Sequence, residues 1–376
     1  MVDNKFFPEI KGNFGFGCMR LPMRDGKVDY EEFEKMIDAF IDAGLNYFDT
    51  AHGYIGGQSE TAIRDCLSAR YDRSRFLLTN KLTDPYFEKT EDIRPFIEKQ
   101  LELCGVEYFD FYLMHAQDHE NYKKFKRLKA YETAYSFKEA GLIRHFGLSF
   151  HDTPEVLDQI LTEHPEVEFV QIQFNYADYE SQNVQSRRVY EVCEKHNKPV
   201  IVMEPVKGGN LVNLPIEADK VLRALDGGRN ASYAIRFAAG FPQMMMVLSG
   251  MSNLDQMNDN LSFMKDFKPL DEKETEAIRD VCSILDGIEK IPCTGCRYCI
   301  EENTCPMNIG IPSLFNALNN YTVFNDPGAK GFYQNVLAAG DNGKASDCLK
   351  CGMCEEVCPQ HLDIRDLLEK VAEAFE

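Results

Sequence analysis

Short apolar runs recur along the first three quarters of the chain, and a longer amphipathic stretch follows each of them. The runs are rich in β-branched and aromatic residues, as buried parallel strands are. They span residues 14–19, 45–51, 76–82, 109–115, 145–150, 169–175, 199–205 and 246–251. Eight strand candidates interleaved with helix-like segments predict a (β/α)8 TIM barrel, which typically takes about 250 residues. The alternative is an open doubly wound sheet, but 15-GFGCMR-20 lacks the third glycine of its usual fingerprint.

Cysteine is concentrated at the other end of the sequence, where eight of the 13 cysteines fall in two blocks. The blocks are Cys293, Cys296, Cys299 and Cys305, followed by Cys348, Cys351, Cys354 and Cys358. The second block has the C-x2-C-x2-C-x3-C-P spacing with which bacterial ferredoxins bind 4Fe–4S clusters. Apolar residues repeat after each block, at Ile309/Leu362, Ile311/Ile364 and Leu314/Leu367, which indicates an internal duplication.

Three cysteines at two-residue gaps can supply three thiolates to one cluster, and in two-cluster ferredoxins the fourth ligand comes from the other block. We therefore expect Cys358 to complete the first cluster and Cys305 to complete the second. Zinc is the alternative, but two C-x2-C pairs suffice for zinc and would leave the third cysteine of each block without a role. The sequence thus predicts a barrel over residues 1–275 and a mainly helical, ferredoxin-like iron–sulfur domain over residues 276–376.

Acidic residues outnumber basic ones by 61 to 41 in the 376 residues, which gives a formal net charge of −20. A field of this sign repels phosphate backbones and anionic lipid, so nucleic acid and membranes are poor candidates for partners. The first residues lack a basic segment followed by an apolar one, and no apolar run approaches the ~20 residues that span a bilayer. We expect a cytoplasmic protein.

Four polar residues lie at or just after the ends of successive strand candidates: Asp49, Tyr54, Lys81 and His115. In a barrel of this type the active site lies at the C-terminal ends of the strands. Each residue alone has a plain structural explanation, such as a cap, a loop aromatic, a solvated charge or a core histidine. Together they suit carbonyl reduction, because an ammonium next to a phenol lowers the phenol's pKa and a neutral histidine can hold a carbonyl oxygen.

These residues lie in segments that resemble the aldo/keto reductase family. The segments are 48-FDTAHGY-54, 79-TNK-81 and 112-YLMH-115, with weaker support from 147-GLS-149 and 201-IVMEPVKGG-209. The resemblance implies a barrel that binds NADPH or NADH and reduces an aldehyde or ketone, or oxidises an alcohol. It implies that Tyr54 is the general acid, that Lys81 and Asp49 tune it, and that His115 orients the carbonyl.

The same resemblance implies contacts to the dinucleotide. Ser149 and Gln171 would bind the carboxamide, Met203 and Pro205 would lie at the nicotinamide, and Lys207, Gly208 and Gly209 would wrap the pyrophosphate. The segment 249-SGMSNLDQMNDN-260 would hold the adenosine end through Gly250, Ser252, Gln256 and Asn260. Gln256 stands where arginine is common, and a 2′-phosphate is normally held by arginine or lysine, so the choice between NADPH and NADH stays open.

We therefore interpret the chain as an oxidoreductase whose two 4Fe–4S clusters either exchange electrons with a redox protein partner or play a structural role. Two alternatives are a ferredoxin-linked reductase, in which the clusters feed the barrel site, and a redox sensor that binds nucleotide without turnover. The complete set of Asp49, Tyr54, Lys81 and His115 argues against the sensor. Exposed clusters are damaged by oxygen, so we expect an anaerobic source.

Overall fold

The computed structural model describes residues 4–301, 305–326 and 328–376. Contacts divide the chain into two units. The first holds Met1–Glu180, Val184–Gly208 and Asp226–Thr275, and the second holds Ser181–Asn183, Gly209–Leu225 and Glu276–Glu376. The domain limits 1–275 and 276–376 stay our proposal, since two short segments from within the first range group with the second unit.

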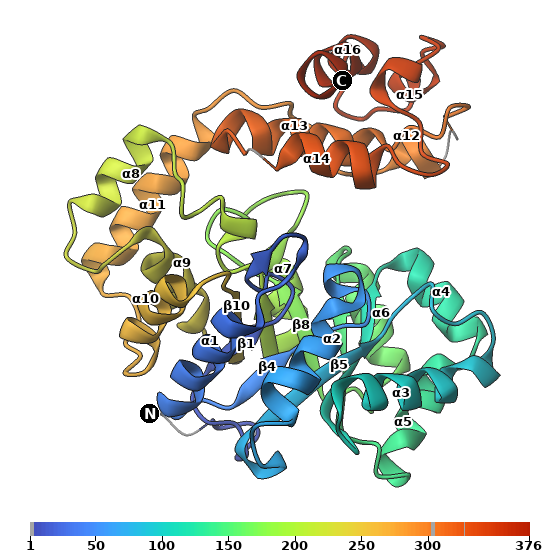
Figure 1. Cartoon of the computed structure of the whole chain (residues 1–376). Coiled ribbons are helices and arrows are strands. Elements are labelled where there is room, and N and C mark those ends of the chain that lie inside the picture. The colour runs from blue at the N-terminus through green and yellow to red at the C-terminus, as the bar shows by residue number, and fades with distance from the viewer. Residues whose placement is uncertain (1–3, 302–304, 327) are drawn as a thin grey trace. The chain divides into compact units, whose positions relative to one another are not determined.

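The first unit is a closed parallel barrel, which confirms the predicted fold class (Figure 1). Around the barrel the strand order is β1-β10-β9-β8-β7-β6-β5-β4. The strands are β1 (Phe14–Gly17), β4 (Tyr47–Asp49), β5 (Leu77–Leu82), β6 (Phe109–Gln117), β7 (Ile143–Phe150), β8 (Phe169–Gln173), β9 (Val200–Met203) and β10 (Met244–Gly250). A small antiparallel hairpin, β2 (Met23–Arg24) and β3 (Lys27–Val28), follows the first barrel strand. Every predicted apolar run therefore overlaps a barrel strand.

Helices follow the strands and bury an apolar face, as the three- and four-residue spacing predicts. In α1 (Tyr30–Asp42), Phe33, Met36, Ile37, Phe40 and Ile41 are buried, and Gly44 follows the helix in a left-handed conformation. The other helices that begin before residue 275 are α2 (Gln58–Ile63), α3 (Thr90–Cys104), α4 (His119–Arg127), α5 (Ala130–Glu139), α6 (Pro154–Glu163), α7 (Ser186–Lys195), α8 (Ile216–Arg223), α9 (Asn230–Ala239), α10 (Leu254–Met264) and α11 (Glu272–Asp286).

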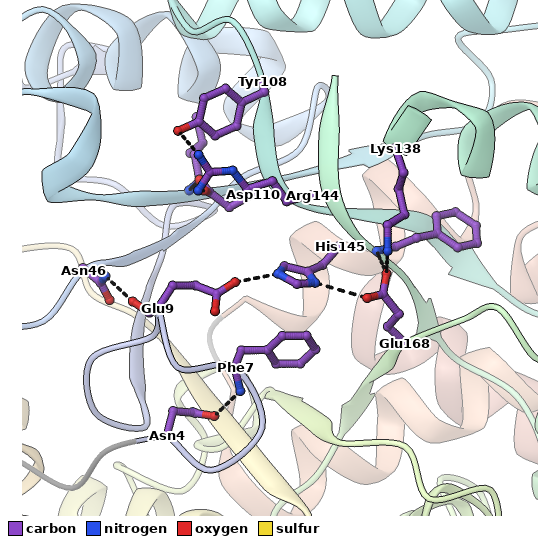
Figure 2. Close-up of polar contacts among 12 residues, drawn as sticks. Asn4, Phe7, Glu9, Asn46, Tyr108, Asp110, Lys138, Arg144, His145 and Glu168 are labelled. Atoms are coloured by element: carbon purple, nitrogen blue, oxygen red, sulfur yellow. Dashed lines mark hydrogen bonds and ion pairs between the residues drawn. The ribbon is translucent and has the colours of Figure 1, made fainter. Parts of the chain in front are cut away.

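The N-terminal end of the barrel is filled by the segment that precedes β1. Phe7 packs edge-on against Phe111 and His145, with ring centroids 5.3 and 4.5 Å apart. Figure 2 shows the imidazole of His145 between two carboxylates: Nε2 lies 2.5 Å from Glu9 Oε1 and Nδ1 lies 3.2 Å from Glu168 Oε2. This cluster ties the N-terminal segment to β7 and to the start of β8, away from the strand ends that carry the candidate catalytic residues.

The second unit is mainly helical, as predicted, and has a core of its own. Its further helices are α12 (Tyr298–Glu301), α13 (Ile311–Phe324), α14 (Ala329–Phe332), α15 (Met353–Glu356) and α16 (Ile364–Phe375). The internal duplication is visible in the fold, because α13 and α16 begin at the equivalent residues Ile311 and Ile364, both of which are buried. On α16, Leu368, Val371 and Phe375 are buried as well.

Candidate functional site

A buried ion pair lies at the C-terminal end of the barrel. Lys81, at the end of β5, donates from Nζ to Asp49 Oδ1 at 2.7 Å and to the carbonyl oxygen of Thr50 at 2.8 Å. Lys81 is fully buried and Asp49 is 3% exposed, so neither charge is solvated. Burial alone would lower the pKa of Lys81, but the charges of Asp49 and Tyr54 raise it above its usual value. The ammonium is therefore retained at neutral pH.

Tyr54 reaches this pair from the loop after β4. The Lys81 Nζ atom lies 4.9 Å from the centroid of the Tyr54 ring. The loop is held by side chains on both sides of Tyr54: Thr50 and Ser59 share a hydrogen bond of 2.8 Å, and His52 Nδ1 lies 2.6 Å from Glu60 Oε2. The sequence analysis did not select Glu60, which is fully buried in α2.

The pKa of Tyr54 differs from the sequence-based expectation. Burial raises this pKa, the charge of Lys81 lowers it only in part, and Asp49 raises it further. The net direction is upward, whereas the tyrosine–lysine pattern predicts a lowered pKa. The expectation was wrong because it counted the ammonium and left out desolvation, which favours the neutral phenol. Tyr54 is consequently protonated at neutral pH.

His115 completes the group from β6, the strand beside β5. Its ring centroid lies 6.1 Å from that of Tyr54. Burial, Lys81 and His151 all lower the pKa of His115 well below its ordinary value, so the imidazole is neutral. The structure thus brings together all four residues that the sequence singled out. It also adds Thr83, whose Oγ1 lies 2.7 Å from His115 Nδ1 and which sequence reasoning missed.

Ser149 and Gln171 stand side by side on neighbouring strands, because the register pairs them directly between β7 and β8. The Ser149 hydroxyl accepts a hydrogen bond of 2.7 Å from the backbone N–H of Ala116. Gln171 is 3% exposed, yet its Oε1 atom has no hydrogen-bond partner among the described residues. A buried amide oxygen without a partner is costly, so this position fits an amide donor supplied by a ligand.

The loop after β9 supplies glycines but no free ammonium. Met203 ends the strand half-buried, and Pro205 is buried just beyond it. Lys207 and Gly208 have positive φ angles of 48° and 67°, and that of Gly209 is 110°. The ammonium of Lys207 is held 2.6 Å from Asp178 Oδ1, which lowers the pKa of that buried carboxyl. Lys207 therefore contributes backbone to this loop, and its charge is already paired.

The segment after β10 is built around the start of α10. Gln256 accepts from the Ser252 backbone N–H at 2.8 Å, and Asn260 donates to Ser249 Oγ at 2.8 Å. Gly250 and Ser252 are exposed at the turn that precedes the helix. The side chain of Gln256 thus shapes the turn itself.

Arg20 is a second residue that the sequence reading did not select. A Cβ placed on Gly208 would lie 3.5 Å from Arg20 Nη2, and one on Gly250 would lie 3.3 Å from Arg20 Cδ. The Arg20 carbonyl also accepts a hydrogen bond of 2.9 Å from Ser252 Oγ. The guanidinium makes no ion pair with any residue that the structure describes. It lies near Gly208, and the aliphatic part of the same side chain lies near Gly250. Its position three residues after a barrel strand was the available signal.

The eight clustered cysteines line two cavities in the second unit. One cavity is lined by Cys293, Cys296, Cys299 and Cys358, among other residues. The other is lined by Cys305, Cys348, Cys351 and Cys354, among other residues. Each cavity therefore draws three thiols from one block and one from the other, in the combination that the spacing predicts. Ile311 lines both cavities.

The thiols surround space instead of converging on one point. Among the described residues, no three or more His, Cys, Asp or Glu side chains are arranged as the ligands of a single metal ion. A tetrahedral zinc site would need four ligands within about 2.3 Å of a common centre. Four thiols around a cavity fit a larger group, such as a 4Fe–4S cube.

None of the helices in the described part of the chain has the length and apolar character needed to cross a bilayer.

Family models match both the barrel region and the cysteine-rich region of the chain. Residues 13–282 match the aldo/keto reductase family, and residues 292–362 match the 4Fe-4S dicluster domain. An uncharacterized oxidoreductase of Bacillus subtilis, YqkF, is 23% identical over 299 residues, which cover 70% of this chain and 90% of that protein. The 4-dihydromethyl-trisporate dehydrogenase of Mucor mucedo is 31% identical over 106 residues, or 27% of this chain and 30% of that enzyme.

Solved structures show the same barrel. An aldo-keto reductase from Bacillus halodurans, in its holo form, superposes with a TM-score of 0.57 at 20% identity, covering 72% of this chain and 91% of that one. An aldo-keto reductase from Klebsiella pneumoniae in complex with NADPH gives a TM-score of 0.58 at 19% identity, covering 72% and 90%.

A (β/α)8 barrel with ionisable groups gathered at its C-terminal end is the architecture of an enzyme. The family match extends over well more than half of the sequence and includes every strand of the barrel. This chain belongs to the aldo/keto reductase family. It is an oxidoreductase of this family, and it carries a C-terminal 4Fe–4S dicluster domain.

Proposed function

We propose that the barrel reduces an aldehyde or ketone with NADPH or NADH, and that Tyr54 gives the proton to the carbonyl oxygen. The observation that carries the proposal is the contact between Tyr54 and the buried Lys81–Asp49 pair, with Nζ 4.9 Å from the ring centroid. Because the pKa of Tyr54 is raised, the phenol holds its proton at neutral pH and is ready to act as an acid.

The other residues have distinct roles in this proposal. Asp49 fixes and neutralises Lys81, whose ammonium stabilises the phenolate that forms when the proton leaves. Neutral His115 donates a hydrogen bond to the same carbonyl oxygen and orients the substrate. The dinucleotide, when bound, supplies the hydride for the carbonyl carbon.

The residues around the mouth of the barrel fit that dinucleotide. The unpartnered Oε1 of Gln171, beside Ser149, suits the N–H groups of a carboxamide. The backbone can approach a phosphate closely at Gly208, Gly209 and Gly250. Arg20 supplies a positive charge for that phosphate, because the ammonium of Lys207 is already paired with Asp178. Gln256 offers no charge to a 2′-phosphate, so we expect NADH to bind at least as well as NADPH.

The experiment is an anaerobic titration of the purified protein with NADH and NADPH against a panel of aldehydes, ketones and quinones. We expect turnover in the wild type and a loss of at least about a hundredfold in kcat for Tyr54→Phe, which removes the acid. Tyr135→Phe is the matched control, because Tyr135 is exposed on α5. Equal activity of Tyr54→Phe and Tyr135→Phe would contradict the proposal.

The second candidate function has the clusters feed electrons to the barrel. The paired state of Lys207 and the neutral Gln256 favour it, because both weaken the attraction for a dinucleotide. In that case reduced viologen, and neither NADH nor NADPH, would support turnover. In both functions the two cavities hold 4Fe–4S clusters, with the ligand sets described above, and a redox protein exchanges electrons with them.

A further inference from the structure

Thr83 holds a position that links β5 to the candidate catalytic histidine. It lies two residues after Lys81, and side chains two residues apart in an extended chain share a face. The register between the strands pairs Lys81 with Leu113 and Leu82 with Met114, and its continuation places Thr83 opposite His115. The result is the contact of 2.7 Å between Thr83 Oγ1 and His115 Nδ1. Thr83 is 9% exposed, so water competes little for this contact.

The direction of this hydrogen bond decides what the other side of the imidazole can do. A neutral imidazole has one N–H group, so a hydrogen bond donated to Nδ1 leaves the proton on Nε2. The Thr83 hydroxyl has one proton and two acceptors within reach: His115 Nδ1 at 2.7 Å and the Lys81 carbonyl oxygen at 3.2 Å. The Lys81 carbonyl already accepts from Gln100 Nε2 at 3.0 Å. We take the shorter contact, to His115 Nδ1, as the one that receives the Thr83 proton, which leaves the Lys81 carbonyl oxygen to Gln100.

We propose that Thr83 is a positioning residue that donates to Nδ1 of His115 and holds the imidazole in the tautomer with its proton on Nε2. Within the described residues Nε2 has no hydrogen-bond partner, so its N–H is available to a ligand. An N–H group at this point selects a substrate atom that accepts a hydrogen bond, as a carbonyl oxygen does. This role in catalysis rests on the proposed function, but the tautomer itself does not.

The tautomer can be read directly in the whole protein labelled with 15N-histidine. The ring nitrogens of the eight histidines give distinct two-bond correlations, and His115→Gln identifies the signal of His115 by its loss. We expect a protonated Nε2 and an unprotonated Nδ1 in the wild type and in Thr83→Ser, which keeps the hydroxyl. In Thr83→Val, which keeps the shape and loses the donor, a population with protonated Nδ1 should appear. A protonated Nδ1 in the wild type would overturn the proposal, as would an unchanged tautomer in Thr83→Val.

Kinetics give a second readout. For a carbonyl substrate, Thr83→Val should lower kcat/KM by roughly fivefold to tenfold, the worth of one hydrogen bond, and Thr83→Ser should restore most of it. An equal loss in both variants would contradict the role of the hydroxyl. If the wild type reduces no carbonyl compound, the proposed function fails, whereas the NMR measurement still decides what Thr83 does. Should Thr83→Val not fold, the spectrum of the wild type decides alone.

Discussion

At the scale of single residues, the site depends on one buried ammonium that serves two neighbours. Lys81 bonds to Asp49 and lies against the ring of Tyr54, and both charges are removed from water. A buried ion pair contributes little net stability when complete, but removal of one partner leaves an uncompensated charge. Asp49 depends strongly on Lys81, because its Oδ2 atom is buried without a hydrogen-bond partner in the described part of the chain.

We predict that Lys81→Met lowers the free energy of unfolding by about 3–5 kcal/mol, because it leaves the Asp49 carboxylate alone in the barrel. The double variant Lys81→Met with Asp49→Leu should regain most of that loss. The free energies of unfolding of the single and double variants are measured by urea denaturation, with circular dichroism as the signal. If the double variant were as unstable as the sum of the two single variants, the pair would not be coupled in the way described.

The sequence identified the residues of this site better than it identified their electrostatic balance. Asp49, Tyr54, Lys81 and His115 were predictable because each lies near or just after the C-terminal end of a strand, and these ends lie together at one end of a parallel barrel. The raised pKa of Tyr54 could not be predicted from the sequence, because the desolvation that raises it depends on the packing of neighbouring loops. The partner of Lys207 was equally hidden, because Asp178 lies on a different loop. The contacts of Thr83 and Arg20 cross between strands and loops, and the only sequence signal for Arg20 was its position just after a strand.

At the scale of elements, the cluster around His145 joins three parts of the barrel floor: the N-terminal segment, β7 and the residue before β8. Burial alone would lower the pKa of His145, but its hydrogen bonds with Glu168 and Glu9 raise it above the ordinary value (Figure 2). Lys138 donates to Glu168 at 2.7 Å and keeps that carboxylate charged. The protonated imidazole is thus favoured in the folded state.

A group with a raised pKa in the folded state stabilises the fold below its unfolded pKa, which is about 6.5 for histidine. That contribution is lost as the pH rises through the folded pKa of His145. We therefore predict that His145→Gln is most destabilising near pH 6 and that the difference from wild type shrinks toward pH 9. Thermal unfolding of both proteins across this range measures the difference. A difference that stays constant, or grows with pH, would contradict the charged state of His145.

At the scale of the whole molecule, the chain joins a reductase barrel to a dicluster domain that carries two repeated blocks of cysteines. The spacing of the cysteines predicts that each cluster takes its fourth ligand from the other block, and each cavity is lined by three cysteines of one block and one of the other. The limits of the domains were harder to predict, because segments 181–183 and 209–225 group with the second unit although they lie between barrel elements in the sequence.

We predict that the holoprotein contains about eight iron and eight acid-labile sulfide per chain. Cys358→Ser should alter the same cluster as Cys296→Ser and leave the other unchanged, because both residues line one cavity. Electron paramagnetic resonance of the reduced protein distinguishes the two clusters. Cys282→Ser is the control, since Cys282 lines neither cavity. Zinc in place of iron, or damage to the cluster of Cys348, Cys351 and Cys354 by Cys358→Ser, would contradict the ligand sets.

The most direct test of the central claim follows the hydrogen that reaches the substrate carbon. The protein is supplied with NADH or NADPH carrying deuterium at C4 of the nicotinamide, in either stereochemical form, and with a carbonyl substrate that is turned over. We predict that the alcohol product carries deuterium from one of the two forms, and that Tyr54→Phe abolishes its formation. A product that forms with reduced viologen alone and contains no deuterium from either dinucleotide would contradict hydride transfer in the barrel.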